Sequence, residues 1–432
     1  MNRKDLWEAL EQIDDDLLME AAKPRRAMHS WKRWGALAAC LVLMVTGIWV
    51  WERGRGVSNQ ADSSMPYFAS AERTVSENET TSETVMEGEN VMNNFAYMTG
   101  DELLSGEENG LYSPASLYYA LGMTAAGAVG DTQTQLLKIL NAESLDSLLE
   151  RCLKARQGGG LKIAGSLWID QALGEPAQSY AEQLERYFGA EVFSVDFGAP
   201  GTAERMGEWV SEQTEGLVVY TPSEDPGPLS LLNTVYYQSR WAEKFRETDT
   251  REDTFTRGDG QEIAVPFMNG VMAGQIYHGD GYVRGELSLE EGRMIFILPE
   301  ESLDALMSGK GTRALFEEGE GDEAMIEWHI PKFSCDGTLQ AAELLQQLGD
   351  GADFSGMTAN GVNLLVSDVT QKTHIDVNEY GVEAAAYTEV AMKMSAVFAA
   401  EESLYLNRPF LYGLYDEAGN LLFMGVCENP AG

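Results

Sequence analysis

The sequence predicts an α+β domain with large sheets, preceded by an N-terminal segment of different character. Helical patterns come mostly early in the domain and strand-like patterns mostly late, an order that is typical of α+β folds. No repeat of fixed period is present, which argues against a repeat architecture. With 432 residues and 44% hydrophobic residues, the chain is long enough for one large domain or two ordinary ones with a buried core.

Capping signals and periodicity predict the individual elements. Residues 113–128 predict a helix capped by Ser113 with Pro114 in its first turn, and residues 131–140 predict another capped by Asp131. Amphipathic periodicity predicts three more helices, at residues 179–189, 203–214 and 338–349. Runs rich in β-branched and aromatic residues predict the strands, at residues 161–170, 229–241, 292–300, 324–333, 362–370 and 420–430.

The stretch GVEAAAYTEV, residues 381–390, combines three consecutive alanines with a strand-like alternation. Alanine favours helix, yet a period of two puts the small or apolar residues on one face, namely Val382, Ala384, Ala386, Thr388 and Val390. Such a strand is able to enter between two existing strands, because small side chains do not overpack the site. An ordinary Ala-rich helical turn in a loop is the other interpretation that this stretch leaves open.

The apolar segment at residues 34–51 predicts a transmembrane helix. It has no charged residue, and as a helix it would extend for roughly 27 Å. Trp34, Trp49 and Trp51 lie at its ends, and basic residues crowd its N-terminal side, which places the N-terminus in the cytoplasm. A cleaved signal peptide is the competing interpretation, but the charged region before the segment is long and no clear A-x-A site follows. A buried core helix fits less well, because the segment is apolar all round.

The flanking segments complete a four-part organisation. Residues 1–33 are expected to form a cytoplasmic tail and residues 34–51 the membrane helix. Residues 52–89, rich in Ser, Thr, Glu and Asn, are expected to form a flexible stalk. Residues 90–432 are then expected to form one domain outside the cell. The expected location is the cell membrane, with a single pass.

The charge of the chain argues against nucleic-acid binding. The net charge is −39, and residues 56–432 carry 21 basic against 61 acidic residues. A body this acidic repels phosphate backbones, whereas nucleic-acid binding needs a basic surface.

The cysteine pattern predicts neither a zinc site nor a disulfide framework. Cys40, Cys152, Cys335 and Cys427 show no C-x-x-C spacing, and Cys40 lies in the apolar segment. All four are interpreted as packed thiols, with a pairing among the last three left open.

No recognisable catalytic motif is present. The four histidines, His29, His278, His329 and His374, form no H-E-x-x-H pattern, and neither a G-x-S-x-G elbow nor a phosphate-binding loop occurs. No catalytic residue, metal ligand or cofactor is therefore predicted. A membrane-tethered hydrolase stays as a weaker hypothesis.

Several stretches carry a family resemblance. The stretch HIDVNEYGVEAAAYTEV at 374–390 resembles the hinge of serpins, and LNRPFLYGLYDEAGNLLFMGVCENP at 406–430 resembles their C-terminal signature. Four further stretches are similar to successive serpin segments in family order, namely residues 113–136, 231–245, 294–299 and 328–333. Together they span nearly all of residues 90–430.

The resemblance implies an α+β serpin fold of three β-sheets with eight or nine helices and an exposed reactive loop. It also implies a suicide inhibitor of serine proteases. The target protease cleaves the loop and is held as an acyl-enzyme, while the freed segment inserts as a new central strand of the main sheet. The protein is expected to act as a monomer at the cell surface. The alternative is a noninhibitory surface binding protein of the same fold.

The resemblance also assigns site residues. Glu379 and Lys332 match a gate pair where insertion begins. Ser113, Ser116, Asn233 and Gln371 match a polar shutter cluster under the centre of the sheet, with Gln371 in place of the usual histidine. The hinge comprises Glu379, Gly381, Val382, Glu383, Ala384, Ala385, Ala386 and Thr388. Val382 replaces the common threonine, Tyr387 the usual alanine, and Val426 an arginine of the C-terminal signature.

Counting along the family register places the reactive bond at Ser395–Ala396. Because the segment up to Pro409 is longer than usual, four nearby residues are alternatives for the position before the cut, namely Met392, Lys393, Met394 and Phe398. The stretch Met-Ser-Ala-Val suits elastase-like or subtilisin-like proteases, whereas a cut after Lys393 implies a trypsin-like target. A cysteine protease is a further possibility.

Overall fold

The computed structural model describes residues 80–104, 108–156, 161–222, 228–340, 348, 352–363, 368–382 and 399–431. The predicted cytoplasmic tail, membrane helix and most of the predicted stalk lie outside these residues, as do the loop residues 383–398. Within the described ranges, no helix combines the length and the hydropathy that a membrane crossing requires.

Seven α-helices occur among the described residues, fewer than the eight or nine expected. They are α4 (Thr80–Leu103), α5 (Pro114–Gly127), α6 (Gly130–Ile139), α7 (Leu145–Ala155), α8 (Gln178–Gln183), α9 (Thr202–Gln213) and α10 (Leu303–Glu317). Helix α4 begins at Thr80, inside the segment predicted as stalk. A helix that is already formed extends at little cost, so the polar composition of residues 80–89 did not stop it.

The two predicted helix caps differ in outcome. Ser113 caps α5 as predicted, because its side chain accepts a hydrogen bond from the backbone N–H of Ser116 and Pro114 starts the helix. The prediction for Asp131 was wrong, since Val129 occupies the N-cap of α6 and Asp131 lies in the first turn. A carboxylate there still favours the helix through its dipole.

The described strands form two continuous sheets rather than three. The seven-stranded sheet has the order β3-β2-β4-β12-β13-β5, with β11 beside β12. The nine-stranded sheet has the order β1-β16-β15-β9-β8-β7-β10-β14, with β6 beside β7. Strand β7 (Glu262–Gly279) pairs with β6 at one end and with β8 at the other, so one long strand joins two regions that the resemblance counts separately.

The strand bounds are as follows. The smaller sheet contains β2 (Leu161–Asp170), β3 (Glu191–Val195), β4 (Leu229–Tyr237), β5 (Ser239–Arg240), β11 (Phe333–Gln340), β12 (Asp368–Asn378) and β13 (Gly381–Val382). The larger contains β1 (Gly110–Tyr112), β6 (Arg251–Thr256), β7, β8 (Tyr282–Leu289), β9 (Gly292–Pro299), β10 (Asp322–Pro331), β14 (Glu402–Tyr405), β15 (Phe410–Tyr415) and β16 (Leu421–Cys427).

The helix predicted from residue 338 was wrong in its first turn. Residues 338–340 end β11, which pairs with β12 along its whole length. Ladder hydrogen bonds to a neighbouring strand outweighed the amphipathic pattern, as tertiary context often does. The strand predicted at residues 229–241 likewise divides at Gln238 into β4 and β5.

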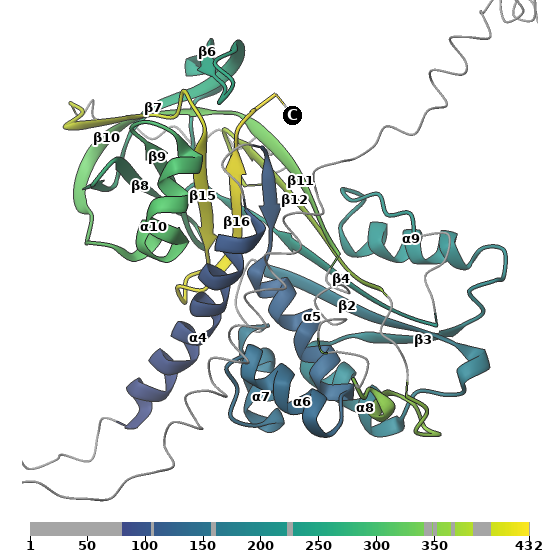
Figure 1. The fold of residues 1–432 in the computed structure, drawn as a ribbon. Coiled ribbons are helices and arrows are strands. Elements are labelled where there is room, and N and C mark those ends of the chain that lie inside the picture. Colours follow the sequence, from purple (N-terminus) through teal and green to yellow (C-terminus); the bar gives the residue numbers. More distant parts are fainter. Residues whose placement is uncertain are drawn as a thin grey trace, which may run out of the picture.

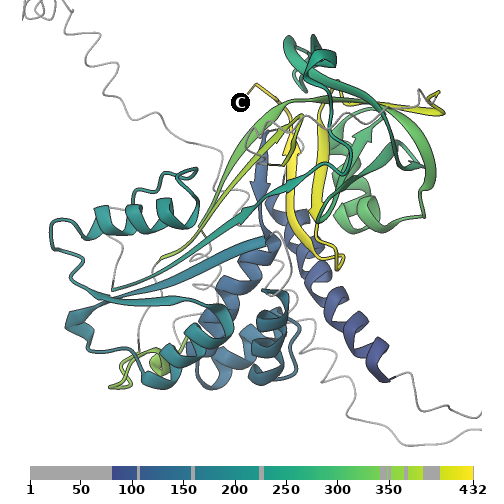
Figure 2. The same cartoon turned by 180° about the vertical axis from the view of Figure 1, so that it is seen from behind.

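The seven-stranded sheet lies between two helical layers. Figures 1 and 2 show α5–α8 along one face and α9 against the other. Alternation along β4 explains this, because Leu231 packs on the α5 side whereas Leu232 joins the small cluster under α9.

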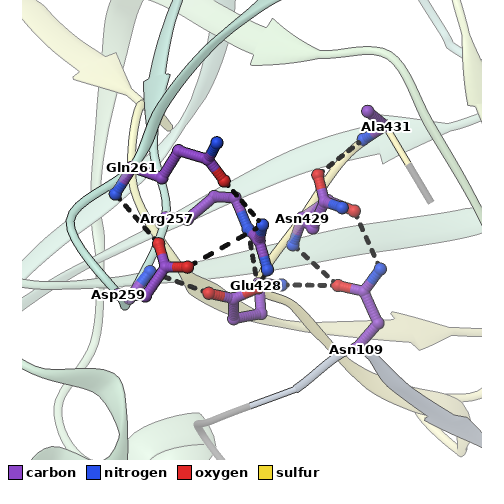
Figure 3. Close-up of polar contacts among 8 residues, drawn as sticks. Asn109, Arg257, Asp259, Gln261, Glu428, Asn429 and Ala431 are labelled. Carbon is purple, nitrogen blue, oxygen red and sulfur yellow. Dashed lines mark hydrogen bonds and ion pairs between the residues drawn. The ribbon is translucent and has the colours of Figure 1, made fainter.

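A polar network fastens the C-terminal segment (Figure 3). Asn109 accepts hydrogen bonds from the backbone N–H groups of Glu428 and Asn429, at 2.7 and 2.8 Å. The buried Glu428 carboxylate accepts from the backbone N–H of Gly258 at 2.8 Å and pairs with Arg257 at 3.4 Å. The last strand, β16, is thereby tied to the turn between β6 and β7.

Three of the four cysteines lie in the described residues. Cys152, Cys335 and Cys427 are buried and free, as the packed-thiol interpretation expects. Burial raises the pKa of the Cys152 thiol to about 12, which keeps it protonated and unreactive. Cys40 lies outside the described residues.

Candidate functional site: a fork between two central strands

Strands β4 and β12 separate at one end and form a fork. They pair in parallel from Ser230↔Asp368 to Val235↔Thr373. Beyond this point β13 lies between them, since Val382 pairs with Val377 of β12 and with Ser239 of β5, the continuation of β4. The two residues of β13 thus occupy the mouth of the fork.

Gly381 is required at the root of β13. Its φ is +151°, and a Cβ atom there would lie 2.2 Å from the Ser239 carbonyl oxygen. No L-residue fits such an approach without moving the backbone. The glycine therefore allows the chain to reverse direction after β12, so that β13 lies antiparallel to β12 at the mouth of the fork.

Val382 fills the fork from the inside. It is 1% exposed and belongs to a buried cluster with Val235, Tyr237, Ile375 and Val377. The structure therefore places the first even-numbered residue of the predicted small face toward the core. The remaining predicted hinge residues, Glu383, Ala384, Ala385, Ala386 and Thr388, lie outside the described residues, as do Ser395 and Ala396.

The structure brings the predicted gate residues into contact. Lys332 Nζ lies 2.9 Å from Glu379 Oε2, and the Thr250 hydroxyl donates to Glu379 Oε1 at 2.8 Å. Desolvation by burial opposes ionisation of Glu379, but the hydrogen bonds from Lys332 and Thr250 outweigh it and lower the pKa of the carboxyl. Glu379 is thus held as a carboxylate beside the fork.

This lowered pKa predicts acid sensitivity at the fork. A carboxyl whose pKa is lowered in the folded state adds stability above its unfolded pKa, about 4.5, and loses it as the pH falls through the folded value. We expect the difference in urea midpoint between the wild-type protein and Glu379→Gln to be constant above about pH 5.5 and to shrink toward about pH 3. A difference that does not vary with pH would contradict this assignment.

The shutter residues meet beneath the centre of the sheet. The Gln371 side chain accepts from the Ser113 backbone N–H at 3.0 Å and donates to the Ser113 carbonyl at 2.8 Å. Ser116 Oγ donates to Asn233 Oδ1 at 3.0 Å, and all four residues are buried. Gln371 and Asn233 are paired between β12 and β4. Gln371 binds the N-cap residue of α5, and Asn233 binds its first turn. The network is therefore satisfied with glutamine in the position of the usual histidine.

Removal of the Gln371 amide is expected to destabilise this network. Gln371→Met leaves the buried N–H of Ser113 without its acceptor, which costs roughly 1–3 kcal/mol. The measurement is urea unfolding of the intact protein. Gln178→Met serves as a control, since the exposed Gln178 amide donates to the Glu182 carboxylate and its loss should change stability by less than about 0.5 kcal/mol. Equal effects of the two substitutions would contradict the network.

Three further residues of the fork were missed by sequence reasoning. Trp241 donates from its indole to the Asn378 carbonyl at 2.8 Å, Thr250 binds Glu379, and Tyr380 bonds to Glu247. They approach from the segment that connects β5 to β6. More than a hundred positions separate this segment from the hinge. The signals in the sequence were Trp241, which lies inside the matched stretch 231–245, and Thr250, which follows that stretch.

The histidines make structural contacts. His329 Nδ1 lies 2.6 Å from Asn269 Oδ1, and His374 Nδ1 lies 2.7 Å from Asp336 Oδ1. In the part of the chain that the structure describes, no three His, Cys, Asp or Glu side chains gather as metal ligands would.

The domain is an α+β fold in which the short strand β13 lies between β12 and β5, at the point where β4 and β12 separate. This arrangement can be compared with known protein families. The family model "Serpin (serine protease inhibitor)" matches residues 90–430, and the chain belongs to the serpin family. Val426, where the family signature usually has arginine, is fully buried in β16. The family is described by inhibition of proteases and not by a catalytic activity.

Known relatives support the assignment across most of their length. The chain is 31% identical over 366 residues to an uncharacterized serpin-like protein of Thermococcus kodakarensis, covering 79% of this chain and 85% of that protein. It is 30% identical to Serpin-Z7 of Hordeum vulgare, covering 76% of this chain and 91% of the relative. Antithrombin-III of Mus musculus is 28% identical, with 75% and 77% covered.

Solved structures show the same fold. The thermophilic serpin tengpin in the native state aligns with a TM-score of 0.70 at 25% identity, covering 83% of this chain and 96% of that one. Human thyroxine-binding globulin complexed with thyroxine aligns with a TM-score of 0.70 at 22% identity, covering 80% and 99%, which is a likeness of fold alone.

Proposed function

We propose that this protein is a suicide inhibitor of serine proteases. The target protease cleaves the loop that follows β13 and is held as an acyl-enzyme, while the cut segment inserts between β4 and β12. The observation that carries the proposal is the position of β13, because its two residues already occupy the mouth of the fork with Val382 buried.

Continuation of the β13 register predicts where the inserted strand would lie. Each further pair of loop residues moves two positions down β12 and two positions down β4. Ala384 would then lie between Ile375 and Tyr237, Ala386 between Thr373 and Val235, and Thr388 between Gln371 and Asn233. Thr373↔Val235 and Gln371↔Asn233 are the pairs that β12 and β4 form now. Insertion therefore requires these strands to separate without slipping along each other.

The same register explains the composition of the loop. Odd-numbered residues of β12 face the core, so even-numbered loop residues would point inward beside them. Alanine at 384 and 386 fits between side chains that are already closely packed. Tyr387 would point outward beside Lys372, whose Nζ now lies 6.0 Å from the centre of the Tyr220 ring. Bulk is tolerated on that face.

Insertion would release free energy that the present fold retains. A new central strand makes ladder hydrogen bonds on both sides and buries its apolar face. The fold described here keeps β4 paired with β12 instead, so a kinetic barrier would hold it in place until the loop is cut. Insertion must also outrun hydrolysis of the acyl-enzyme.

The proposed reactive bond is Ser395–Ala396. The target would be an elastase-like or subtilisin-like serine protease, because the residues around this bond are small or aliphatic. Cleavage after Met392, Lys393, Met394 or Phe398 is the alternative.

The proposal extends to location. We infer that residues 34–51 anchor the protein in the cell membrane, with the inhibitor domain outside the cell. The eighteen uncharged residues and the flanking tryptophans and basic residues of that segment support this inference.

A noninhibitory surface binding protein is the second candidate. The likeness to thyroxine-binding globulin supports it at the level of fold. The small, uncharged inward face of residues 382–390 favours inhibition, because a charge or a proline there would obstruct insertion.

A protease panel tests the proposed function. The full-length protein is incubated with elastase-like, subtilisin-like, trypsin-like and chymotrypsin-like proteases, and adducts that survive denaturant are sought on gels. The site of cleavage is located by mass spectrometry. We expect an adduct with a cut near Ser395. Cleavage of the loop by every protease without an adduct would favour the binding protein.

A further inference from the structure

We propose that Tyr380 and Glu247 form a latch that positions the root of β13, so that insertion starts promptly once the loop is cut. The Tyr380 hydroxyl donates a hydrogen bond to the Glu247 carboxylate, and Lys244 Nζ lies 5.9 Å from the centre of the Tyr380 ring. The inference rests on the proposed insertion mechanism and adds a positioning residue that the predicted gate and hinge do not include.

The latch acts on the turn from which β13 leaves β12. This turn comprises residues 378–380, and the segment after β5 holds it through its backbone. Trp241 N–H donates to the Tyr380 carbonyl at 3.0 Å, and Phe245 N–H donates to the Glu379 carbonyl at 3.1 Å. The turn is therefore fixed on its backbone side, and the Tyr380 side chain adds a further attachment.

One short helical turn and the residue after it bind two successive side chains of the turn 378–380, those of Glu379 and Tyr380. The 3-10 turn Glu247–Asp249 presents Glu247 to Tyr380, and the next residue, Thr250, binds Glu379. A carboxylate acceptor makes the tyrosine bond a charge-assisted one. The same contact raises the pKa of Tyr380, so its hydroxyl stays a donor at neutral pH.

The helical turn is itself attached to the larger sheet. Asn269 on β7 donates from its amide to the Asp249 carbonyl at 2.9 Å, and its carbonyl oxygen contacts His329 of β10. The latch thus connects the turn 378–380 to β7 and β10, two strands that take no part in the fork. A support on rigid strands holds a side chain in place better than a free loop does.

The pairing register of β13 explains why the latch would affect the rate of loop insertion. The present pairs of β13 with β12 and β5 are the first pairs of the inserted strand, so insertion extends them and leaves the turn where it is. The latch is expected to persist before and after insertion. It therefore affects how often Val382 leaves the fork and hardly affects the stability of the final state.

The test follows insertion after the loop is cut, in the full-length protein. A saturating amount of a protease that nicks the loop is added, and the growth of heat-resistant protein is measured with time. Tyr380→Phe keeps the ring and removes the donor, and Glu247→Ala removes the acceptor at an exposed position. We expect each substitution to slow the gain of heat resistance by about three- to tenfold and to leave the final unfolding midpoint unchanged.

Two controls complete the design. The double variant Tyr380→Phe/Glu247→Ala should be no slower than either single variant, because both remove one contact. Tyr187→Phe, in the helical turn Leu184–Phe188 that packs on the α5 side of the smaller sheet, should match the wild-type rate. If the wild-type protein gains heat resistance and both single variants gain it at the same rate, the latch is overturned alone. If the nicked wild-type protein gains none, the insertion mechanism and the latch fail together.

Discussion

Ala384→Arg is expected to convert the protein from an inhibitor into a substrate. On insertion, continuation of the β13 register would place residue 384 between Ile375 and Tyr237, which are both 1% exposed. Burying an unpaired guanidinium there costs several kcal/mol, so the inserted strand cannot pass this point quickly. We expect the yield of denaturant-resistant adduct to fall at least tenfold and turnover of the cut loop to rise, as measured on gels with a protease that the wild-type protein traps.

Glu383→Arg is the matched control for this substitution. It carries the same side chain one residue earlier. There the continued register would point it outward, between the exposed Gln238 and the half-buried Asp376. The adduct yield should stay within about twofold of the wild-type yield, since the new cation lies beside an acidic residue. Equal loss of adduct in both variants would show that residues 383 and 384 do not alternate between the two faces of a strand.

Glu379→Lys is expected to destabilise the fork in the intact protein. The substitution replaces a buried carboxylate by a cation directly beside Lys332 and removes the acceptor of Thr250. Breaking a buried ion pair typically costs about 3–5 kcal/mol, and the partial exposure of Lys332 argues for the lower end. We expect the urea midpoint to fall accordingly. We also expect the fraction of monomeric protein to fall on warming as oligomers form, because an opened sheet edge accepts a strand from another copy.

The charge-reversed pair provides the control for the gate. Lys332→Glu combined with Glu379→Lys restores opposite charges at the same two positions. It should recover about half or more of the lost stability, while Lys332→Glu alone should not. A double variant as unstable as the sum of its parts would show that the two residues do not interact across the fork.

The sequence predicted the elements that depend on local chemistry. The cap of α5 followed from a serine before a proline, and the strand β9 from a run of apolar residues. The inward position of Val382 followed from a period of two. In each case the signal lies within a few residues, where backbone sterics and side-chain alternation act directly.

Contacts between residues far apart in the sequence could not be predicted from local sequence patterns. The contact of Thr250 with Glu379 joins residues 129 positions apart, and no spacing in the sequence encodes it. The fusion of two expected sheets depends on β7 continuing through both, which only strand pairing reveals. How Gln371 replaces the usual histidine was also beyond the sequence, since its amide reaches both backbone groups of Ser113 only in the folded structure.

The central claim is that the cut loop enters the sheet between β4 and β12. The most direct measurement is amide hydrogen exchange of residues 383–394 after a protease has nicked the bond near Ser395. The account predicts that residues 383–390 become protected by at least about a thousandfold relative to a free peptide of the same sequence, because their N–H groups join the ladders. Exchange at the rate of the free peptide after the cut would contradict the claim.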